Sequence, residues 1–379
     1  MTVYADNAAT TKVCRAAIDA MLPCLDEIYA NPSSIHPEGQ RAKAVLDGAR
    51  RKTADVIRCK PSEIYFTSSG SESDNQALLS AALIGKSQGK THIISTAFEH
   101  HAVLEALKKL EKDGFEVTLL GVHEDGIIRS SELADAIRDD TCLVSVMYAN
   151  NEIGTIQPIK EIGEICRKRG VLFHTDAVQA VGHVDIDVGR DNIDLMSFSS
   201  HKFHGPKGAA VLYARKGVQL TRLLLGGGQE RGFRAGTENV PAIAGMAAAL
   251  TEQAKNIEAN AEKVSALRSY LTDELLKIPG TRLNGSGESR LPGNVNVCFE
   301  NVSGESLLVL LCEKGICASA GSACMSGSLE PSHVLLSIGR SEKEAKGALR
   351  LTLSEENTME EAKYIAECVR DAVVRLRAQ

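Results

Sequence analysis

The sequence has no apolar run long enough to cross a membrane, no block of like charge and no C-x-x-C pair. A membrane-spanning helix needs about 20 mostly apolar residues, so we expect a protein without a membrane partner. The formal net charge of −6, without a basic arm, gives no reason to expect direct binding to nucleic acid. Residues 1–6 lack a charged leader followed by an apolar stretch, so we expect no secretory signal and a cytoplasmic protein.

Ten cysteines are scattered along the chain, and without a C-x-x-C pair neither a zinc site nor a thioredoxin-like pair is predicted. We expect reduced thiols, most of them small core residues. Cys324 is the exception, because the small and polar residues 321–328 around it are typical of an exposed loop. An accessible thiol acts as a nucleophile if its pKa is lowered. Cys317 adjoins an apolar run and is expected to be structural.

Apolar, β-branched runs recur through the first two-thirds of the 379 residues and predict buried strands. These runs are residues 64–67, 92–95, 117–120, 143–147, 171–173 and 195–198, with helical patterns at 73–84, 102–110 and 159–168. The alternation predicts an α/β fold with a mostly parallel sheet sandwiched by helices. A long helical pattern over 241–276 precedes a final hundred residues that predict a smaller α/β domain with strands at 295–297 and 349–353.

Lys202 lies between two predicted strands, in the segment Ser-Ser-His-Lys-Phe-His-Gly-Pro-Lys-Gly (199–208), and Asp176 follows another apolar run in His-Thr-Asp-Ala-Val-Gln (174–179). Ligands of parallel sheets bind at the carboxyl ends of strands, where both residues are expected. A lone lysine in such a place is usually a solvated loop residue. Pyridoxal phosphate (PLP) enzymes, however, need a lysine for the aldehyde and a carboxylate for the pyridinium nitrogen, and this pairing favours a PLP site.

Other strand ends carry polar residues with two interpretations each. Residues 66–75 link a strand to a helix and would bind phosphate at the helix start or only cap the helix; no Walker motif supports a nucleotide. His100 would stack on a flat cofactor or cap a helix, and Asn151 would bind a ligand or make an Asx-turn. Arg350, inside an apolar strand pattern, would bind a substrate carboxylate or form an internal salt bridge.

Taken together, these segments resemble cysteine desulfurases of the NifS/IscS type, which are class V aminotransferase-like PLP enzymes of fold-type I. The resemblance runs from Tyr4 to Thr358. Its most specific pieces are residues 199–202, 174–179, 231–239 and 319–324. It implies a large PLP-binding domain over 12–257 and a small domain over 258–379, with 1–11, that carries the catalytic cysteine loop.

The resemblance also implies roles for individual residues. Lys202 would hold PLP covalently and act as the base, Cys324 would be the sulfur nucleophile, and His100 would stack on the ring and assist proton transfer. The other implied cofactor contacts are Gly70, Ser71, Asn151, Asp176, Gln179, Ser199, Ser200, His201 and Thr237, the last reaching the phosphate of a partner subunit. Arg350 and Asn151 would bind the substrate carboxylate.

The implied activity is removal of sulfur from L-cysteine, which gives L-alanine and a persulfide on Cys324. A homodimer, and a sulfur acceptor such as an iron–sulfur scaffold or a tRNA-thiolation protein, are implied partners. No intrinsic metal is expected, although Cys324 would be able to ligate an iron–sulfur cluster transiently. The alternatives are a selenocysteine lyase or another class V aminotransferase or lyase. The chain departs from the family pattern at residues 354–356, Ser-Glu-Glu, and ends without the longer tail of similar housekeeping members.

Overall fold

The computed structural model describes residues 2–320 and 331–378 of the chain. Cys324 lies outside the described residues. Over the described ranges, no helix combines the length and the apolar character that a membrane crossing needs.

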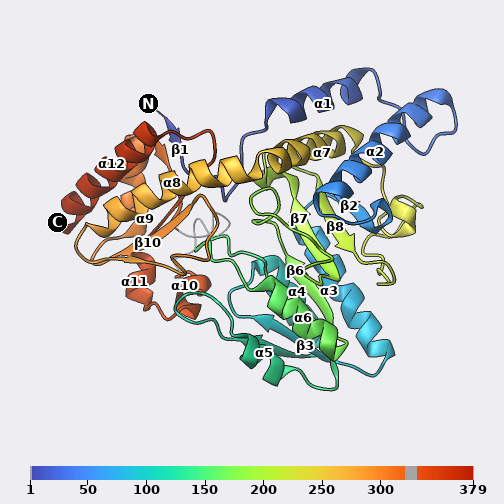
Figure 1. Ribbon diagram of the computed structural model, residues 1–379, viewed down its shortest axis with the longest axis horizontal. Helices are drawn as coiled ribbons and strands as arrows, with labels where there is room; N and C mark the ends of the chain where they lie inside the picture. Colours follow the sequence, from blue (N-terminus) through green and yellow to red (C-terminus); the bar gives the residue numbers. More distant parts are fainter. Residues whose placement is uncertain (1, 321–330, 379) are drawn as a thin grey trace.

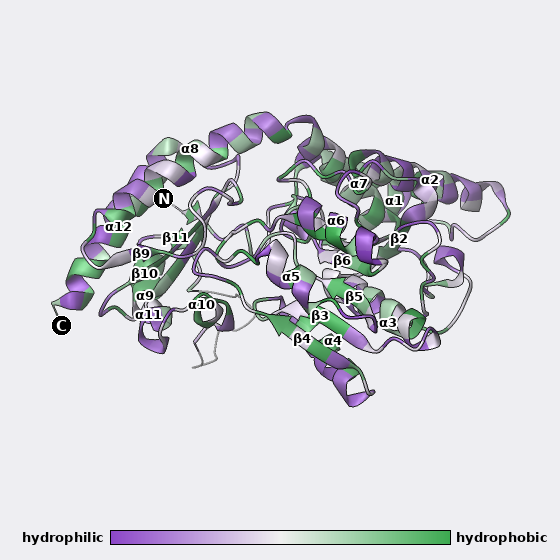
Figure 2. Ribbon diagram, turned by 60° about the horizontal axis from the view of Figure 1, so that its bottom comes forward, coloured by the Kyte–Doolittle hydropathy of each residue, from purple (hydrophilic) through white to green (hydrophobic). Residues whose placement is uncertain are grey.

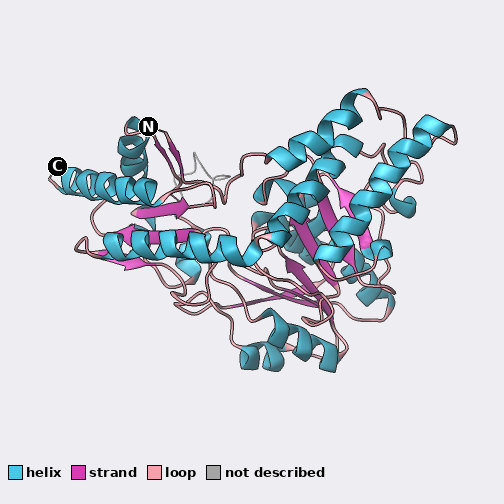
Figure 3. Ribbon diagram, turned by 45° about the horizontal axis from the view of Figure 1, so that its top comes forward, coloured by secondary structure: helices cyan, strands magenta, loops and turns pink. Residues whose placement is uncertain are grey.

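A seven-stranded sheet is the centre of the larger lobe and follows the order β2-β8-β7-β6-β5-β3-β4 (Figures 1 and 3). Its strands are β2 (Ile64–Thr67), β3 (His92–Thr96), β4 (Glu116–Leu120), β5 (Thr141–Ser145), β6 (Leu172–Asp176), β7 (Leu195–Ser199) and β8 (Ala210–Ala214). Only β8 runs antiparallel to its neighbours, so the predicted α/β fold with a mostly parallel sheet is confirmed.

Alternate residues of these strands are buried on opposite faces of the sheet, as the two-residue repeat of a strand requires. Ile93, for example, packs in one apolar cluster and Ile94 in the other. Helices α3 (Gly70–Ser87) and α4 (His101–Lys112) cover the first face. The second face is covered by α2 (Pro37–Val56), α6 (Ile159–Arg169) and α7 (Val240–Lys255), while α1 (Arg15–Asp26) packs on α7 and α5 (Ser130–Ala136) lies beside α6. Figure 2 shows the apolar strands between helices of mixed polarity. Each fully buried leucine or isoleucine contributes about 1.5–3 kcal/mol.

The smaller lobe is built on an antiparallel sheet of order β12-β10-β9. Its strands are β9 (Thr281–Leu283), β10 (Asn294–Phe299) and β12 (Ala348–Thr352), covered by α8 (Ile257–Leu276), α9 (Gly304–Glu313) and α12 (Met359–Arg377). Near the amino end of the chain, β1 (Val3–Tyr4) pairs with β11 (Ile316–Cys317) in this lobe. Helices α10 (His333–Ser337) and α11 (Glu342–Lys346) contribute residues to the core of the larger lobe.

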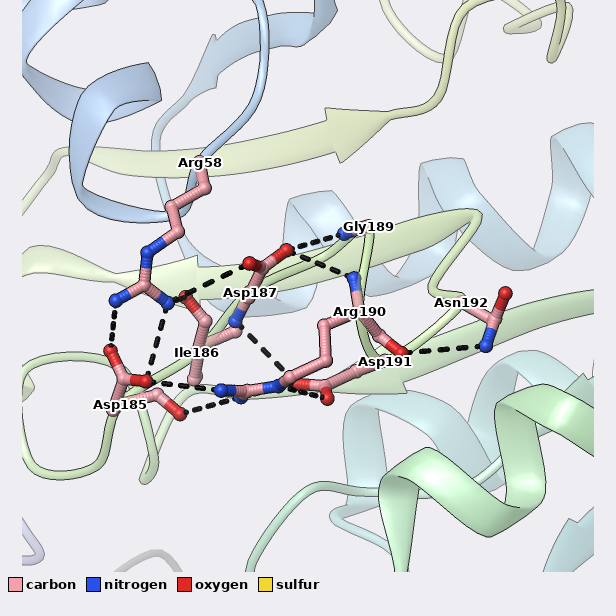
Figure 4. A network of polar contacts seen from close by, with 8 residues as sticks. All are labelled: Arg58, Asp185, Ile186, Asp187, Gly189, Arg190, Asp191 and Asn192. Atoms are coloured by element: carbon pink, nitrogen blue, oxygen red, sulfur yellow. Dashed lines mark hydrogen bonds and ion pairs between the residues drawn. The ribbon is translucent and has the colours of Figure 1, made fainter.

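The connection from β6 to β7 is braced by the polar network of Figure 4. Arg58, just past α2, holds the carboxylate of Asp185 at 2.6 Å, and Arg190 holds the same carboxylate at 3.1 Å and that of Asp191 at 2.8 Å. The carboxylate of Asp187 accepts the backbone N–H of Arg190. The network fixes the segment that separates the two strands carrying Asp176 and Lys202.

Two expectations are corrected. The helical pattern over 241–276 forms two helices, because Asn256 leaves helical geometry (φ −113°, ψ 11°) between α7 and α8. Cys317 is exposed rather than a structural core residue, since β11 is a short strand at the surface. Of the nine described cysteines, Cys24, Cys142, Cys166 and Cys298 are buried, as expected for core residues, and Cys312 on α9 is exposed.

Candidate active site

The polar segments singled out in the sequence meet at the carboxyl edge of the seven-stranded sheet. Asp176 is the last residue of β6, and Lys202 ends a single 3-10 turn that directly follows β7. His100 caps α4 beyond β3, and Gly70 begins α3 beyond β2. Parallel neighbouring strands bring these ends together because they all point the same way.

The Lys202 side chain is held by a segment from the start of the chain. Its Nζ donates hydrogen bonds to the carbonyl oxygens of Ala8 (2.7 Å) and Ala9 (2.8 Å). Thr11 donates from its backbone N–H and its hydroxyl to the carbonyl of His201. Gln179 donates to the same Ala8 carbonyl at 3.0 Å. Residues 8–11 therefore form a strap across the lysine turn, which the sequence analysis did not predict.

Asp176 belongs to a buried acidic pair. Its Oδ1 accepts the backbone N–H of Val178 at 2.9 Å, and burial raises its pKa while the charge of His100 opposes the shift. Asp74 of α3 is wholly buried, and both burial and the Asp176 charge raise its pKa. Two carboxylates so close do not both ionise readily. The pKa of Asp74 is raised further than that of Asp176, so Asp176 is the carboxyl of the pair that ionises first.

His174 is also buried near Asp176 and is in its neutral form. Its ring nitrogens contact the hydroxyls of Ser145 (2.9 Å) and Ser197 (3.1 Å), and burial lowers its pKa to about 3. An uncharged imidazole leaves Asp176 as the charged group beneath the site.

His100 stands where Asp176 and Lys202 both act on it. Its Nδ1 accepts the N–H of Ala102 at 3.2 Å, which leaves Nε2 as the nitrogen that carries the proton of the neutral ring. Burial lowers the pKa of His100, the Lys202 charge lowers it further, and the Asp176 carboxylate opposes these effects. The structure therefore brings the three predicted residues together.

The start of α3 is suited to an anion. A Cβ at Gly70 would lie 2.8 Å from a methyl group of Val178, so only glycine fits this close approach between α3 and the segment after β6. Ser200 is fully buried, and its hydroxyl has no hydrogen-bond partner among the described residues. His201 contacts the hydroxyl of Thr10 at 3.2 Å. The N-terminus of α3 favours an anion such as a phosphate. The buried Ser200 hydroxyl is a further polar group that a ligand would satisfy.

Arg350 of β12 reaches this edge from the smaller lobe. Its side chain is 1% exposed and pairs with Asp6 at 2.9 Å, while it also donates to the carbonyl of Asn151 at 3.1 Å. Ser319 donates to the same Asp6 oxygen. The internal salt bridge that we considered is therefore present. Within the described residues the Arg350 Nε has no hydrogen-bond partner, so its N–H is left for a ligand.

Thr237 lies apart from Lys202, in a hollow of about 240 Å³ that it lines with Thr67 and Ser68. Asn150, next to Asn151, makes the Asx-turn that the sequence suggested, accepting the N–H groups of Glu152 and Ile153. Glu99 and Asp74 are site residues that sequence reasoning missed. The sequence indicated each of them only by position: Asp74 lies within the predicted phosphate-binding segment 66–75, and Glu99 directly precedes His100.

Comparison with known proteins fits this geometry. Residues 3–365 match the family described as Aminotransferase class-V. The chain belongs to this family. It is 53% identical over 375 residues to a cysteine desulfurase IscS of Methanosarcina thermophila, covering 99% of this chain and 93% of the relative.

Solved structures agree with this assignment. A NifS-like protein superposes with a TM-score of 0.93 at 39% identity, covering 99% of this chain and 100% of that chain. A structure described as SspA in complex with cysteine gives a TM-score of 0.83 at 36% identity, covering 93% of this chain and 99% of that chain.

PLP is the cofactor of this family, and the residues present fit it. The Gly70 cradle, the unsatisfied Ser200 hydroxyl and the Asp176 carboxylate supply a phosphate site and a partner for a protonated ring nitrogen. Across residues 2–320 and 331–378, no group of three or more histidine, cysteine or acidic side chains is arranged to hold a metal ion.

Proposed function

We propose that this protein is a cysteine desulfurase that takes sulfur from L-cysteine and releases L-alanine. The observation that carries the proposal is the convergence of Lys202, Asp176 and His100 at one sheet edge, in a chain 53% identical to a cysteine desulfurase. PLP, when bound, supplies an electron sink for the bond-breaking steps.

Several residues of this chain would hold that cofactor, each at a different group. Lys202 would hold the aldehyde carbon and Asp176 the ring nitrogen. Gln179 would bind the ring hydroxyl, and His100 and Asn151 would contact the ring. Gly70, Ser71, Ser199, Ser200 and His201, with Thr237 of a second copy, would hold the phosphate.

Binding and proton transfer follow from the same geometry. Arg350 and Asn151 bind the substrate carboxylate, for which the unpartnered Arg350 Nε is available. Lys202 would take the Cα proton of the substrate at its Nζ. The neutral His100 ring carries a proton on Nε2 for transfer to the departing groups.

Sulfur transfer falls to Cys324. Its thiolate attacks the substrate sulfur, a sulfur–sulfur bond forms, and the carbon–sulfur bond breaks. The electron pair of that bond stays with the substrate carbon, which takes a proton and leaves as alanine. The Cys324 persulfide then passes its outer sulfur to an iron–sulfur scaffold, a tRNA-thiolation protein or another carrier in the cytoplasm.

The domain division belongs to the same proposal. Residues 12–257 form the cofactor-binding domain, and residues 258–379 with 1–11 form the small domain. The separate apolar core of the smaller lobe, to which α8 and β1 both contribute, supports this boundary.

The test uses two variants and a matched control. Lys202→Ala should abolish the yellow absorbance of the bound cofactor and lower kcat by about 10²–10⁴-fold through loss of the base alone. Cys324→Ala should keep the colour and yield no sulfide from cysteine with dithiothreitol, whereas Cys317→Ala, at an exposed thiol, should turn over normally. A Cys324→Ala protein with normal turnover would refute the persulfide step. A preference for selenocysteine over cysteine, or alanine formed without sulfide, would favour the alternative lyase.

A further inference from the structure

A buried charge pair, His204 and Glu355, joins the two lobes close to the Lys202 turn. Glu355, just past β12, places its carboxylate 3.4 Å from Nε2 of His204, and Gln253 of α7 donates to that carboxylate at 2.7 Å. The His204 side chain is 3% exposed and that of Glu355 24% exposed. Neither residue has a role in the chemistry described above.

The backbone and ring of His204 are fixed on all other sides. Its backbone N–H donates to the hydroxyl of Thr11 at 2.7 Å, and its Nδ1 donates to the carbonyl of Lys12 at 2.9 Å. Its φ of +64° is a left-handed conformation that a non-glycine residue adopts only when its surroundings hold it there. Since Nδ1 already carries a proton, Nε2 offers a proton to Glu355 only when the ring is a cation.

Each residue of this pair lies close in the sequence to a residue that the proposed function assigns to the substrate, Lys202 or Arg350. His204 lies two residues after Lys202, and its carbonyl accepts the N–H of Cys14, three residues past the strap of residues 8–11. Glu355 lies just beyond the strand that carries Arg350. The pair is therefore the closest charged link between the lysine turn and the arginine strand among the described residues.

We propose that His204 and Glu355 are a positioning pair that keeps the Arg350 strand in place relative to the Lys202 turn and so sets the affinity for the substrate carboxylate. This inference rests on the proposed function, in which Arg350 binds that carboxylate. Neither residue of the pair touches the reacting atoms.

The pair also gives this link a pH dependence. Burial by itself would lower the pKa of His204, but the bond to Glu355 outweighs it and raises the pKa. Burial would raise the pKa of Glu355, but His204 lowers it to about 2. The stability that His204 contributes is full below its unfolded pKa of about 6.5 and is lost as the pH rises through its raised folded pKa. The stability that Glu355 contributes is lost only in strong acid.

The other charged groups near His204 and Glu355 do not replace the contact that this pair makes between the lobes. Glu356 pairs with Lys12 at 3.5 Å on the surface, and its charge adds less than that of Glu355 to the raised pKa of His204. Lys263 donates to the Glu355 backbone carbonyl. His183 lies near enough for the His204 charge to lower its pKa, but burial already keeps it neutral. The link between the lobes therefore weakens at alkaline pH through His204.

The test compares Glu355→Gln with Glu356→Gln in the full-length holoenzyme. Glutamine at 355 still hydrogen-bonds to a neutral His204 ring, so the variant keeps the contact without its pH dependence. Between pH 6 and pH 8.5 the KM of the wild type for L-cysteine should rise about fivefold more than that of Glu355→Gln. Glu356→Gln removes only the weaker influence on the pKa of His204 and should keep most of the wild-type rise. The kcat ratios of the three proteins should stay constant. The temperature midpoint of unfolding, measured over the same pH range, should fall less in Glu355→Gln.

Parallel KM and unfolding profiles in all three proteins would overturn the proposal. His204→Gln provides a second check, since it too should flatten both profiles even if Glu355→Gln folds poorly. Arg350→Gln separates the two claims. If it raises KM while Glu355→Gln does not flatten the profile, the positioning pair is wrong and the carboxylate site stands; if it leaves KM unchanged, the carboxylate site itself is wrong, and this inference with it.

Discussion

At the scale of single residues, the site is defined by which buried groups carry charge. Burial raises the pKa of both Asp74 and Asp176, but the His100 and Lys202 charges and the Val178 backbone N–H favour the ionised form of Asp176, whereas His174 is neutral. Glu99 is a further buried acid, and burial raises its pKa to about 8. Its Oε1 accepts from Thr96 and from the backbone of Met147, and no described residue bonds its Oε2.

Replacing Glu99 with glutamine tests this assignment. A glutamate pKa raised from about 4.5 means that the unfolded chain loses this proton first, so the wild type loses stability as the pH rises from about 4.5 to about 8. Glu99→Gln keeps the accepted hydrogen bonds and has no proton to lose. Its unfolding temperature should match that of the wild type near pH 5 and exceed it above pH 8. Midpoints measured by circular dichroism over this range decide the matter, and parallel curves for the two proteins would mean that Glu99 is ionised in the fold.

The sequence predicted the location of Lys202, Asp176 and His100 because each lies at or within four residues of the end of an apolar strand, and parallel strands place their carboxyl ends together. It was insufficient for their partners. Asp74 meets Asp176, and Ala8 meets Lys202, across long stretches of chain, and no local pattern encodes such a meeting. The interpretation of Arg350 stayed open for the same reason, since its partner Asp6 comes from the other end of the chain.

At the scale of elements, the start of α3 depends on one missing side chain. Gly70 allows α3 to approach the segment after β6, where a Cβ would lie 2.8 Å from Val178. The positions of β2 to β7 were predicted because their apolar runs are short and bounded. The prediction did not include β8, the one antiparallel strand of the large sheet, or the break between α7 and α8, because Asn256 does not interrupt the helical periodicity.

Gly70→Ala should separate α3 from the Val178 segment and disturb the phosphate site. We expect a loss of about 1–3 kcal/mol in the free energy of unfolding from overpacking, together with weaker retention of PLP on dialysis. Gly48→Ala is the matched control, because Gly48 lies within α2 with its nearest neighbour at 3.9 Å. Alanine there should stabilise the protein by about 0.5–1 kcal/mol. Urea unfolding and the cofactor absorbance measure both effects, and equal behaviour of the two variants would contradict the steric argument.

At the scale of the whole molecule, large apolar side chains are exposed on α1 and in the segment that follows it. Leu22 and Leu25 lie on α1, while Tyr29 (76% exposed) and Ile35 (95% exposed) follow it. Exposed apolar groups favour association. The proposed function requires a homodimer in which Thr237 of one copy reaches the phosphate site of the other, and we expect the α1 surface to form part of its interface.

A charge on this surface should therefore separate the copies. Leu25 is 61% exposed, so Leu25→Glu costs the isolated chain little, whereas burying an unpaired carboxylate in an interface costs several kcal/mol. We expect a monomer by size-exclusion chromatography with light scattering, and weaker retention of PLP because Thr237 of the second copy is lost. Val374→Glu is the control, because Val374 is 63% exposed on α12 in the smaller lobe. A dimer that persists in Leu25→Glu, or that dissociates in Val374→Glu, would place the interface elsewhere. A monomer that keeps its cofactor fully would instead remove Thr237 from the phosphate site.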